Sequence, residues 1–136
     1  MSARHVAVLV LYNEHKEILL QHRSVDAVRL PNYWAFFGGG IEGLESPEQA
    51  LARELLEELE YPVQAPRLIW TQKIVVNGDE VTKYIFVERY DPRRPLIQHE
   101  GQDMKWWRIE DTTALKIVDH DRIALARVQQ FLGSMP

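Results

Sequence analysis

Short runs of Val, Ile, Leu and aromatic residues, separated by polar turns, cover most of the chain. Runs of this length bounded by turn residues predict β-strands. We expect strands over residues 6–12, 18–21, 68–76, 81–90 and 104–109. Polar residues 13–16 would join the first two strands as a hairpin. Asn77-Gly78-Asp79 lies between the next two, and Asn-Gly in this position is a strong hairpin signal.

Two other segments have helical signals. Ser46-Pro47-Glu48-Gln49 offers a serine cap, a proline at the first helical position and a glutamine for a capping box, so a helix is expected to about Leu59. Residues 123–132 have helical spacing, with Asp119 or Asp121 as the cap. The triplet Gly38-Gly39-Gly40 predicts a loop, because glycine frees the backbone to turn. Strands and helices without a regular βαβ rhythm predict an α/β (α+β) fold, a mixed sheet with helices packed on it.

Composition narrows the functional classes. The 136 residues are 46% hydrophobic, enough for one domain spanning residues 1–136. A net charge of −4 argues against a nucleic-acid polymer as partner. The absence of cysteine excludes thiolate metal sites and cysteine nucleophiles. No leader-like segment and no run of membrane-spanning length is present, which predicts a cytoplasmic protein without membrane contact.

The first helix carries a concentrated acidic stretch. At 100° per residue we place its apolar residues on one broad arc, and its carboxylates on the other side. The apolar arc consists of Leu51, Ala52, Leu55, Leu56 and Leu59, and the acidic side of Glu54, Glu57 and Glu58. A solvated surface stripe is one interpretation. Carboxylates three and four positions apart repel each other, however, and a bound Mg²⁺ or similar hard cation would relieve that repulsion.

The spacing of the residues in and before this helix favours a cation-binding role over a solvated surface stripe. Gly39, five residues, Glu45, seven residues and then Arg53-Glu54-Leu55-Leu56-Glu57-Glu58 closely resemble the Nudix box. The end of the box departs from the pattern: Glu60 stands in place of the glycine, and Tyr61 and Pro62 follow instead of an aliphatic residue. We therefore expect the helix to end differently, helped by Pro62. Similarity to the MutT-like branch extends to residues 18–23, 84–90 and 100–102, with Trp106 nearby.

The resemblance implies the Nudix α/β/α sandwich, with a mixed sheet between helices and a loop-helix-loop motif. It assigns Mg²⁺ or Mn²⁺ to Glu54, Glu57, Glu58 and the Gly38 carbonyl group. Arg53 would orient Glu45 or Glu57 through its planar guanidinium. Glu100 is similar in placement to a carboxylate that binds metal or acts as a base in related enzymes. The base that activates water would be Glu54 or Glu100, and the sequence does not choose between them.

The same resemblance implies a small nucleotide substrate. Arg23 is similar in placement to a phosphate-contacting arginine, and His120 to a base-reading asparagine. The aromatic residues Trp34, Phe36, Tyr84 and Phe86 are more typical of core packing than of a nucleobase clamp. A nucleoside di- or triphosphate is the expected substrate. ADP-ribose, a dinucleoside polyphosphate, a nucleotide sugar and a non-catalytic nucleotide sensor are the alternatives, and a homodimer is left open.

Overall fold

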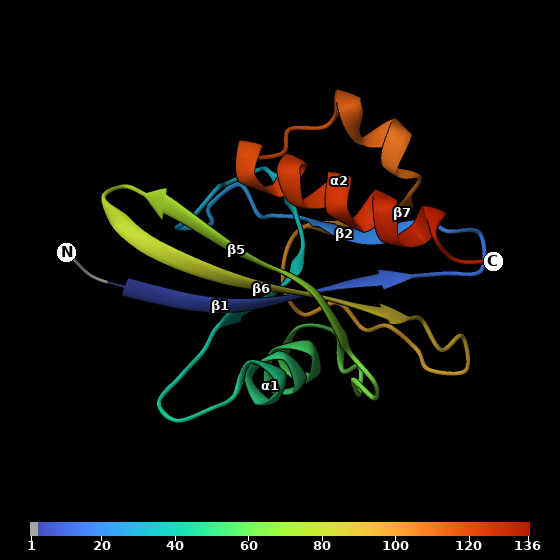
Figure 1. The fold of residues 1–136 in the computed structure, drawn as a ribbon, viewed down its shortest axis with the longest axis horizontal. Helices are drawn as coiled ribbons and strands as arrows, with labels where there is room; N and C mark the ends of the chain where they lie inside the picture. Colours follow the sequence, from blue (N-terminus) through green and yellow to red (C-terminus); the bar gives the residue numbers. More distant parts are fainter. Residues whose placement is uncertain (1–2) are drawn as a thin grey trace.

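The structure, a computed structural model, describes residues 3–136. Its strands form one seven-stranded sheet. They are β1 (Ala3–Tyr12), β2 (Ile18–His22), β3 (Trp34–Ala35), β4 (Phe37–Gly40), β5 (Arg67–Val76), β6 (Asp79–Arg89) and β7 (Asp103–Trp107). The helices are α1 (Pro47–Leu59), the short 3-10 helix η1 (Ile109–Ala114) and α2 (Asp119–Gly133). α1 and α2 lie on opposite faces of the sheet (Figure 1), so the expected mixed sheet between helices is confirmed.

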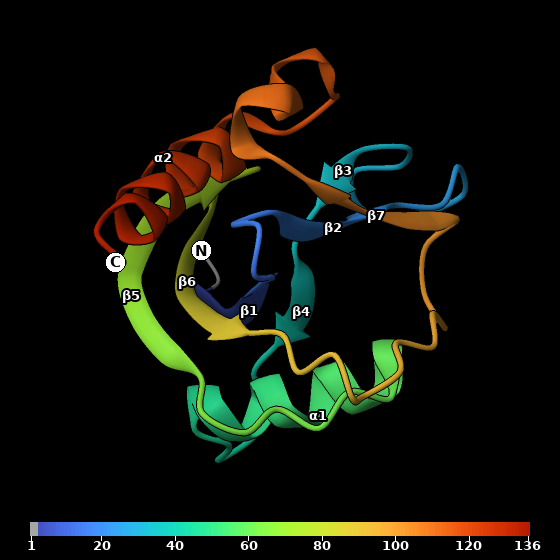
Figure 2. The same cartoon turned by 90° about the vertical axis from the view of Figure 1, so that its right-hand side faces the viewer.

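Strand β1 is the centre of the sheet. It runs parallel to β6 from Ala3↔Glu80 to Tyr12↔Arg89 and antiparallel to β4. In the predicted hairpin, β1 and β2 pair only at Tyr12↔Ile18. Beyond that point β2 pairs with β3 and β7. Figure 2 shows β5 and β6 on one side of β1, with β2 and β7 on the other. The predicted hairpin of β5 and β6 is confirmed, with antiparallel pairing up to Val76↔Asp79.

The core has two halves because alternate residues of each strand point to opposite faces. Val10, Ile85 and Val87 pack under α2. Leu9 and Phe86 pack under α1. The expected core role of the aromatic residues is confirmed: Phe36 and Phe86 are buried, and Trp34 and Tyr84 pack against the two halves.

Two strand predictions need correction. The glycine triplet is not a loop: Gly38, Gly39 and Gly40 belong to β4 and pair with Val8, Ala7 and Val6 of β1. Pairing with β1 satisfies the backbone there, so the triplet lies within the sheet. The last strand, β7, ends at Trp107 instead of residue 109, and the chain continues into the unpredicted helix η1.

The helix signals were right for α1 and incomplete for α2. Ser46 caps α1 with both halves of the capping box, and the helix ends at Leu59 as predicted. Neither Asp119 nor Asp121 caps α2: the helix begins at Asp119 after Val118, which makes no side-chain cap. In residues 3–136, no helix is both long enough and apolar enough to cross a membrane.

The end of α1 also differs from the expectation. Glu60 itself takes the left-handed conformation that glycine would adopt, with φ 54° and ψ 29°. The backbone N–H groups of Glu60 and Tyr61 then donate to the carbonyl groups of Leu56 and Leu55, at 3.0 and 3.2 Å. The helix therefore ends in the geometry typical of a glycine, without the glycine.

The two faces of α1 were partly misassigned. Leu56 is 53% exposed, whereas Glu58 is 1% exposed and lies among the core residues. The helical repeat explains both, because Glu58 is seven residues, almost two full turns, after Leu51, and Leu56 is roughly 140° away from Leu51. One acidic residue of α1 therefore points into the protein.

Candidate metal and phosphate site on helix α1

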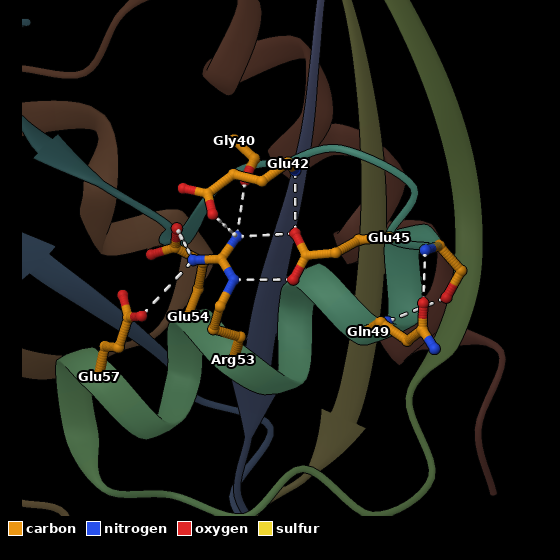
Figure 3. A network of polar contacts seen from close by, with 8 residues as sticks. Gly40, Glu42, Glu45, Gln49, Arg53, Glu54 and Glu57 are labelled. Atoms are coloured by element: carbon orange, nitrogen blue, oxygen red, sulfur yellow. Dashed lines mark hydrogen bonds and ion pairs between the residues drawn. The ribbon is translucent and has the colours of Figure 1, made fainter.

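Arg53 organises the acidic side of α1 (Figure 3). Its Nε and Nη2 donate to the two carboxylate oxygens of Glu45, at 2.8 and 2.9 Å. Nη1 donates to Glu54 at 3.0 Å, and Nη2 also reaches the Gly40 carbonyl oxygen at 3.0 Å. Glu57 lies one turn along the helix, 3.6 Å from Nη1. One guanidinium therefore joins the helix to both β4 and the loop before α1.

The local sequence explains why Glu45 meets Arg53. Ser46, the cap of α1, directly follows Glu45, so Glu45 lies at the helix N-terminus. Glu45 also accepts the backbone N–H of Glu42 at 2.9 Å, which folds the loop back over the helix. The hydrogen bonds from Arg53, then from Glu42, hold the pKa of Glu45 at about 2. The Glu45 carboxylate is therefore ionised and fixed in place.

Glu58 is the acidic residue that points inward. Its Oε1 accepts the backbone N–H of Gly38 at 3.2 Å. Its Oε2 is buried and has no hydrogen-bond partner among the residues that the structure describes. Burial, the neighbouring Glu54 carboxyl group and the charge of Glu100 raise the pKa of Glu58 to about 9. A buried carboxylate oxygen without a hydrogen-bond partner is stabilised either by a proton or by a nearby positive charge.

The glycines of β4 let these carboxylates approach the sheet. A Cβ atom at Gly39 would lie 2.6 Å from the Glu54 carboxylate, so a larger residue there would displace this side chain from its present position. Gly38 has φ +135°, and a Cβ there would lie 2.1 Å from the Ala7 carbonyl oxygen. Gly38 contributes its amide to Glu58, while the contact predicted for its carbonyl group stays a prediction.

These residues fit a divalent cation by their chemistry. Glu54, Glu57 and Glu58 offer the carboxylate oxygens that hard cations prefer. A bound cation would also give the Glu58 oxygen the partner that it lacks. Within residues 3–136, no three acidic or histidine side chains already stand in a metal-ligating arrangement. The reason is visible in the ion pairs, since Arg53 holds Glu54 and Glu57. The Glu57 side chain is 60% exposed, so it can turn from Arg53 to a cation at little cost.

The loop before β7 brings Glu100 to this site. The His99 backbone N–H donates to the Glu58 carbonyl oxygen at 2.8 Å, and Glu100 follows directly. Gln102 donates to the carbonyl oxygen of Arg23 at 2.8 Å, so the same loop also holds the end of β2. The Arg23 side chain donates to the Arg29 carbonyl oxygen at 2.9 Å. Residues 99–102, which include Glu100, therefore contact both the end of α1 and the backbone of Arg23.

His120 lies elsewhere, at the start of α2. Lys83 donates to its Nδ1 at 2.9 Å and forms a buried ion pair with Asp121. Burial alone would raise the pKa of Asp121, but its contacts with His120 and Lys83 outweigh burial and lower it. The structure therefore places His120 in a polar cluster on the α2 side of the sheet, separate from the carboxylates of α1.

Sequence reasoning missed the Lys83–Asp121 pair. The signal was present, because Lys83 alternates with Val81 and Ile85 and so shares their buried face. A charged residue at an inward position needs a partner, and Asp121 supplies it. The contact between Glu60 and His99, 2.5 Å apart through side chains, was also missed because it joins distant parts of the chain.

Sequence comparison finds relatives that are named as nucleotide hydrolases. An 8-oxo-dGTP diphosphatase of Escherichia coli (strain K12) is 44% identical over 59 residues, 43% of this chain and 45% of that protein. The match to the corresponding Proteus vulgaris protein covers 48% of its length, so the chain matches about half of each of these relatives. Nucleoside triphosphatase NudI of Klebsiella pneumoniae (strain 342) is 27% identical over 93% of this chain and 97% of that protein.

Solved structures share the whole fold. The MutT protein from Methanosarcina mazei Go1 superposes with a TM-score of 0.83 at 19% identity, covering 96% of this chain and 95% of that one. The Escherichia coli ORF135 protein gives 0.83 at 25% identity, covering 100% and 95%. The family model described as NUDIX domain matches residues 1–128. Because that match covers most of its length, the chain belongs to the Nudix family.

Proposed function

We propose that the chain is a metal-dependent pyrophosphohydrolase that cleaves a diphosphate linkage in a nucleoside triphosphate-type substrate. The observation that carries this proposal is the cluster of carboxylates that Arg53 holds on α1, with a buried Glu58 oxygen left without a partner. The names of the relatives, 8-oxo-dGTP diphosphatase and nucleoside triphosphatase, support this substrate class.

Glu54, Glu57 and Glu58 would hold Mg²⁺ or Mn²⁺, with the Gly38 carbonyl group as a further ligand. Once bound, the cation would offset charge on the pyrophosphate oxygens and make a nearby water more acidic. Arg53 has a different task. By holding Glu45 and Glu54, it keeps the loop, the helix and β4 in register, so that the carboxylates converge before the substrate arrives.

A general base must take the proton of the attacking water. Glu54 is one candidate: one of its oxygens is engaged by Arg53, which fixes its direction. Glu100 is the other, because its exposed carboxylate lies on a loop tied to the end of α1. Either carboxylate would pass the proton to solvent after the phosphorus–oxygen bond breaks.

The substrate would be recognised at two places. Arg23 would bind a phosphate group from the end of β2, through a guanidinium that can pair with two phosphate oxygens. His120 would contact the base. Nδ1 of His120 faces Lys83 at 2.9 Å and Asp121 at 3.3 Å, so Nε2 is the ring nitrogen that would serve as the donor to the base. A carbonyl oxygen on the base would match that donor.

The test is product analysis on a substrate panel with Mg²⁺ or Mn²⁺. The panel contains dNTPs, oxidised dGTP, ADP-ribose, diadenosine polyphosphates and nucleotide sugars, each with an EDTA blank. Hydrolysis in ¹⁸O-labelled water shows which phosphorus is attacked. Metal-dependent cleavage of a triphosphate to a monophosphate and pyrophosphate is expected. Binding of nucleotides without cleavage would contradict the proposal and indicate a sensor.

A further inference from the structure

The structure gives a use to Glu60, the residue that departs from the Nudix box. Glu60 ends α1 in the left-handed conformation, and this conformation directs its side chain toward the loop before β7. There its Oε2 lies 2.5 Å from Nε2 of His99. Both side chains are 51% exposed, so this is a surface contact at the edge of the site.

The loop that carries His99 runs along the end of α1. The Ile97 backbone N–H donates to the Leu59 carbonyl oxygen at 3.0 Å, and that of His99 to the Glu58 carbonyl oxygen at 2.8 Å. The Glu60–His99 contact adds a side-chain tether to these two backbone bonds. The next residue is Glu100, a carboxylate close enough to Glu58 to affect its ionisation.

The far end of the loop is also held. The Gln102 backbone N–H donates to the His22 carbonyl oxygen at 2.8 Å, and its side chain donates to Asn32 Oδ1 at 2.8 Å. Gln98 donates to the Glu100 carbonyl oxygen at 2.9 Å. Glu100 therefore lies between two anchored points of the loop. The Glu60–His99 contact is the side-chain anchor on the helix side.

The position of Glu100 explains why an anchor is useful. Its carboxylate is exposed on a loop, where a side chain can sample many positions. The Glu60–His99 contact adds to the backbone bonds that restrain this loop at the end of α1. Holding it in place lowers the cost of assembling the metal ligands.

We propose that Glu60 and His99 are positioning residues that keep Glu100, the carboxylate that the resemblance assigns to the metal or to the base, beside Glu58. This inference rests on the proposed function in assuming a metal site on α1. It assigns a purpose to Glu60 that a glycine cannot serve, since glycine has no side chain to reach His99. Neither residue touches substrate or metal.

The experiment measures Mn²⁺ affinity by electron paramagnetic resonance in Glu60→Asn and His99→Ala, each alone and combined. Asparagine tolerates the left-handed conformation but is too short for His99. Each single variant should weaken Mn²⁺ binding about threefold, within the range of a half-exposed ion pair. The double variant should be no weaker than either one, and His99→Gln, which keeps a donor, should restore most of the affinity.

Catalysis supplies the second readout. The Mg²⁺ concentration that gives half-maximal rate should rise about threefold in Glu60→Asn, while kcat at saturating Mg²⁺ is regained. If the contact only stabilised the fold, saturating Mg²⁺ would not restore the kcat of the variant. In the Glu100→Gln background, Glu60→Asn should have no further effect on Mn²⁺ affinity, because the two residues act through one carboxylate.

The matched control is His15→Ala. His15 and Glu14 form another exposed histidine–glutamate pair, 3.5 Å apart, in the turn between β1 and β2. This variant should bind Mn²⁺ like the wild type. Wild-type Mn²⁺ affinity in both Glu60→Asn and His99→Ala, or additive losses with Glu100→Gln, would overturn the inference. Mn²⁺ binding needs no substrate. An inactive wild-type protein would therefore count against the proposed function, while the Mn²⁺ affinities of the variants would still test this inference.

Discussion

Arg53 is the residue on which the geometry of the site depends most. It donates to Glu45 through two nitrogens and also to Glu54 and the Gly40 carbonyl oxygen. Its side chain is 26% exposed, so these charged hydrogen bonds form partly out of water. Lysine keeps the charge but not the planar fork that matches a carboxylate.

We therefore expect Arg53→Lys to lower the free energy of unfolding by about 2 kcal/mol, the range for charged hydrogen bonds. The rate should fall by about tenfold to a hundredfold, because the carboxylates lose their alignment. Urea unfolding and steady-state kinetics measure the two effects. Arg93→Lys is the matched control: Arg93 pairs with Asp91 at 3.0 Å but is 86% exposed, so little should change. Equal stability of both variants would contradict the role of Arg53.

At the residue scale, sequence reasoning found the members of the acidic cluster but not their environments. The spacing of the box brought out Glu54, Glu57 and Glu58 together. It did not show that Glu58 is buried and Glu57 exposed, although the helical repeat contains that information. The contacts of Lys83 with Asp121 and of Glu60 with His99 depend on tertiary packing, which local patterns do not encode.

Among the elements, β4 shows most clearly how a glycine-rich segment serves the site. Gly38 combines φ +135° with a close approach to Ala7 of β1, while nothing lies within 4 Å of a Cβ at Gly40. The amide of Gly38 also donates to Glu58. Glycine is thus required at one position of the strand and merely tolerated at another.

Gly38→Ala should lower the free energy of unfolding by about 3 kcal/mol or more, from backbone strain and the clash with β1. Gly40→Ala should change it by less than about 1 kcal/mol, since the residue is extended and its surroundings are open. Thermal unfolding of both variants measures the difference. Similar melting temperatures for the two would show that β4 does not hold Gly38 as described.

Elements with local signals were predicted well, and those that depend on distant partners were not. The capping box at Ser46 and the Asn77-Gly78 turn each lie within a few residues, and both are present. The pairing of β4 with β1 joins segments about thirty residues apart, so the glycine triplet was taken for a loop. The early start of α2 was missed because its first turn has no side-chain cap.

For the whole molecule, α1 and α2 lie on opposite faces of the sheet (Figure 1). The carboxylates of α1 and the Lys83–Asp121 pair at α2 are therefore two separate polar centres. Burial makes the first centre sensitive to pH. The pKa of Glu58 rises from 4.5 to about 9 on folding, so protonated Glu58 favours the folded state. That contribution is complete below pH 4.5 and is lost as pH rises toward 9.

In EDTA, the free energy of unfolding should therefore fall between about pH 5 and pH 9, and Glu58→Gln should remove most of that fall. Added Mg²⁺ should stabilise the protein increasingly as pH rises, because the cation binds ionised carboxylates. Urea unfolding at several pH values measures both trends. A wild-type slope that persists in Glu58→Gln would mean that another group titrates.

The most direct test of the central claim is the Mg²⁺-dependent cleavage rate of Glu57→Gln. Glu57 is exposed, so its loss should leave the fold and melting temperature nearly unchanged. Glu48→Gln, at an exposed position in the first turn of the same helix, is the control. We predict that Glu57→Gln lowers the rate by at least about a hundredfold, comparable to the loss of a key electrostatic group, while Glu48→Gln cleaves like the wild type. Full activity in a correctly folded Glu57→Gln variant would contradict the account.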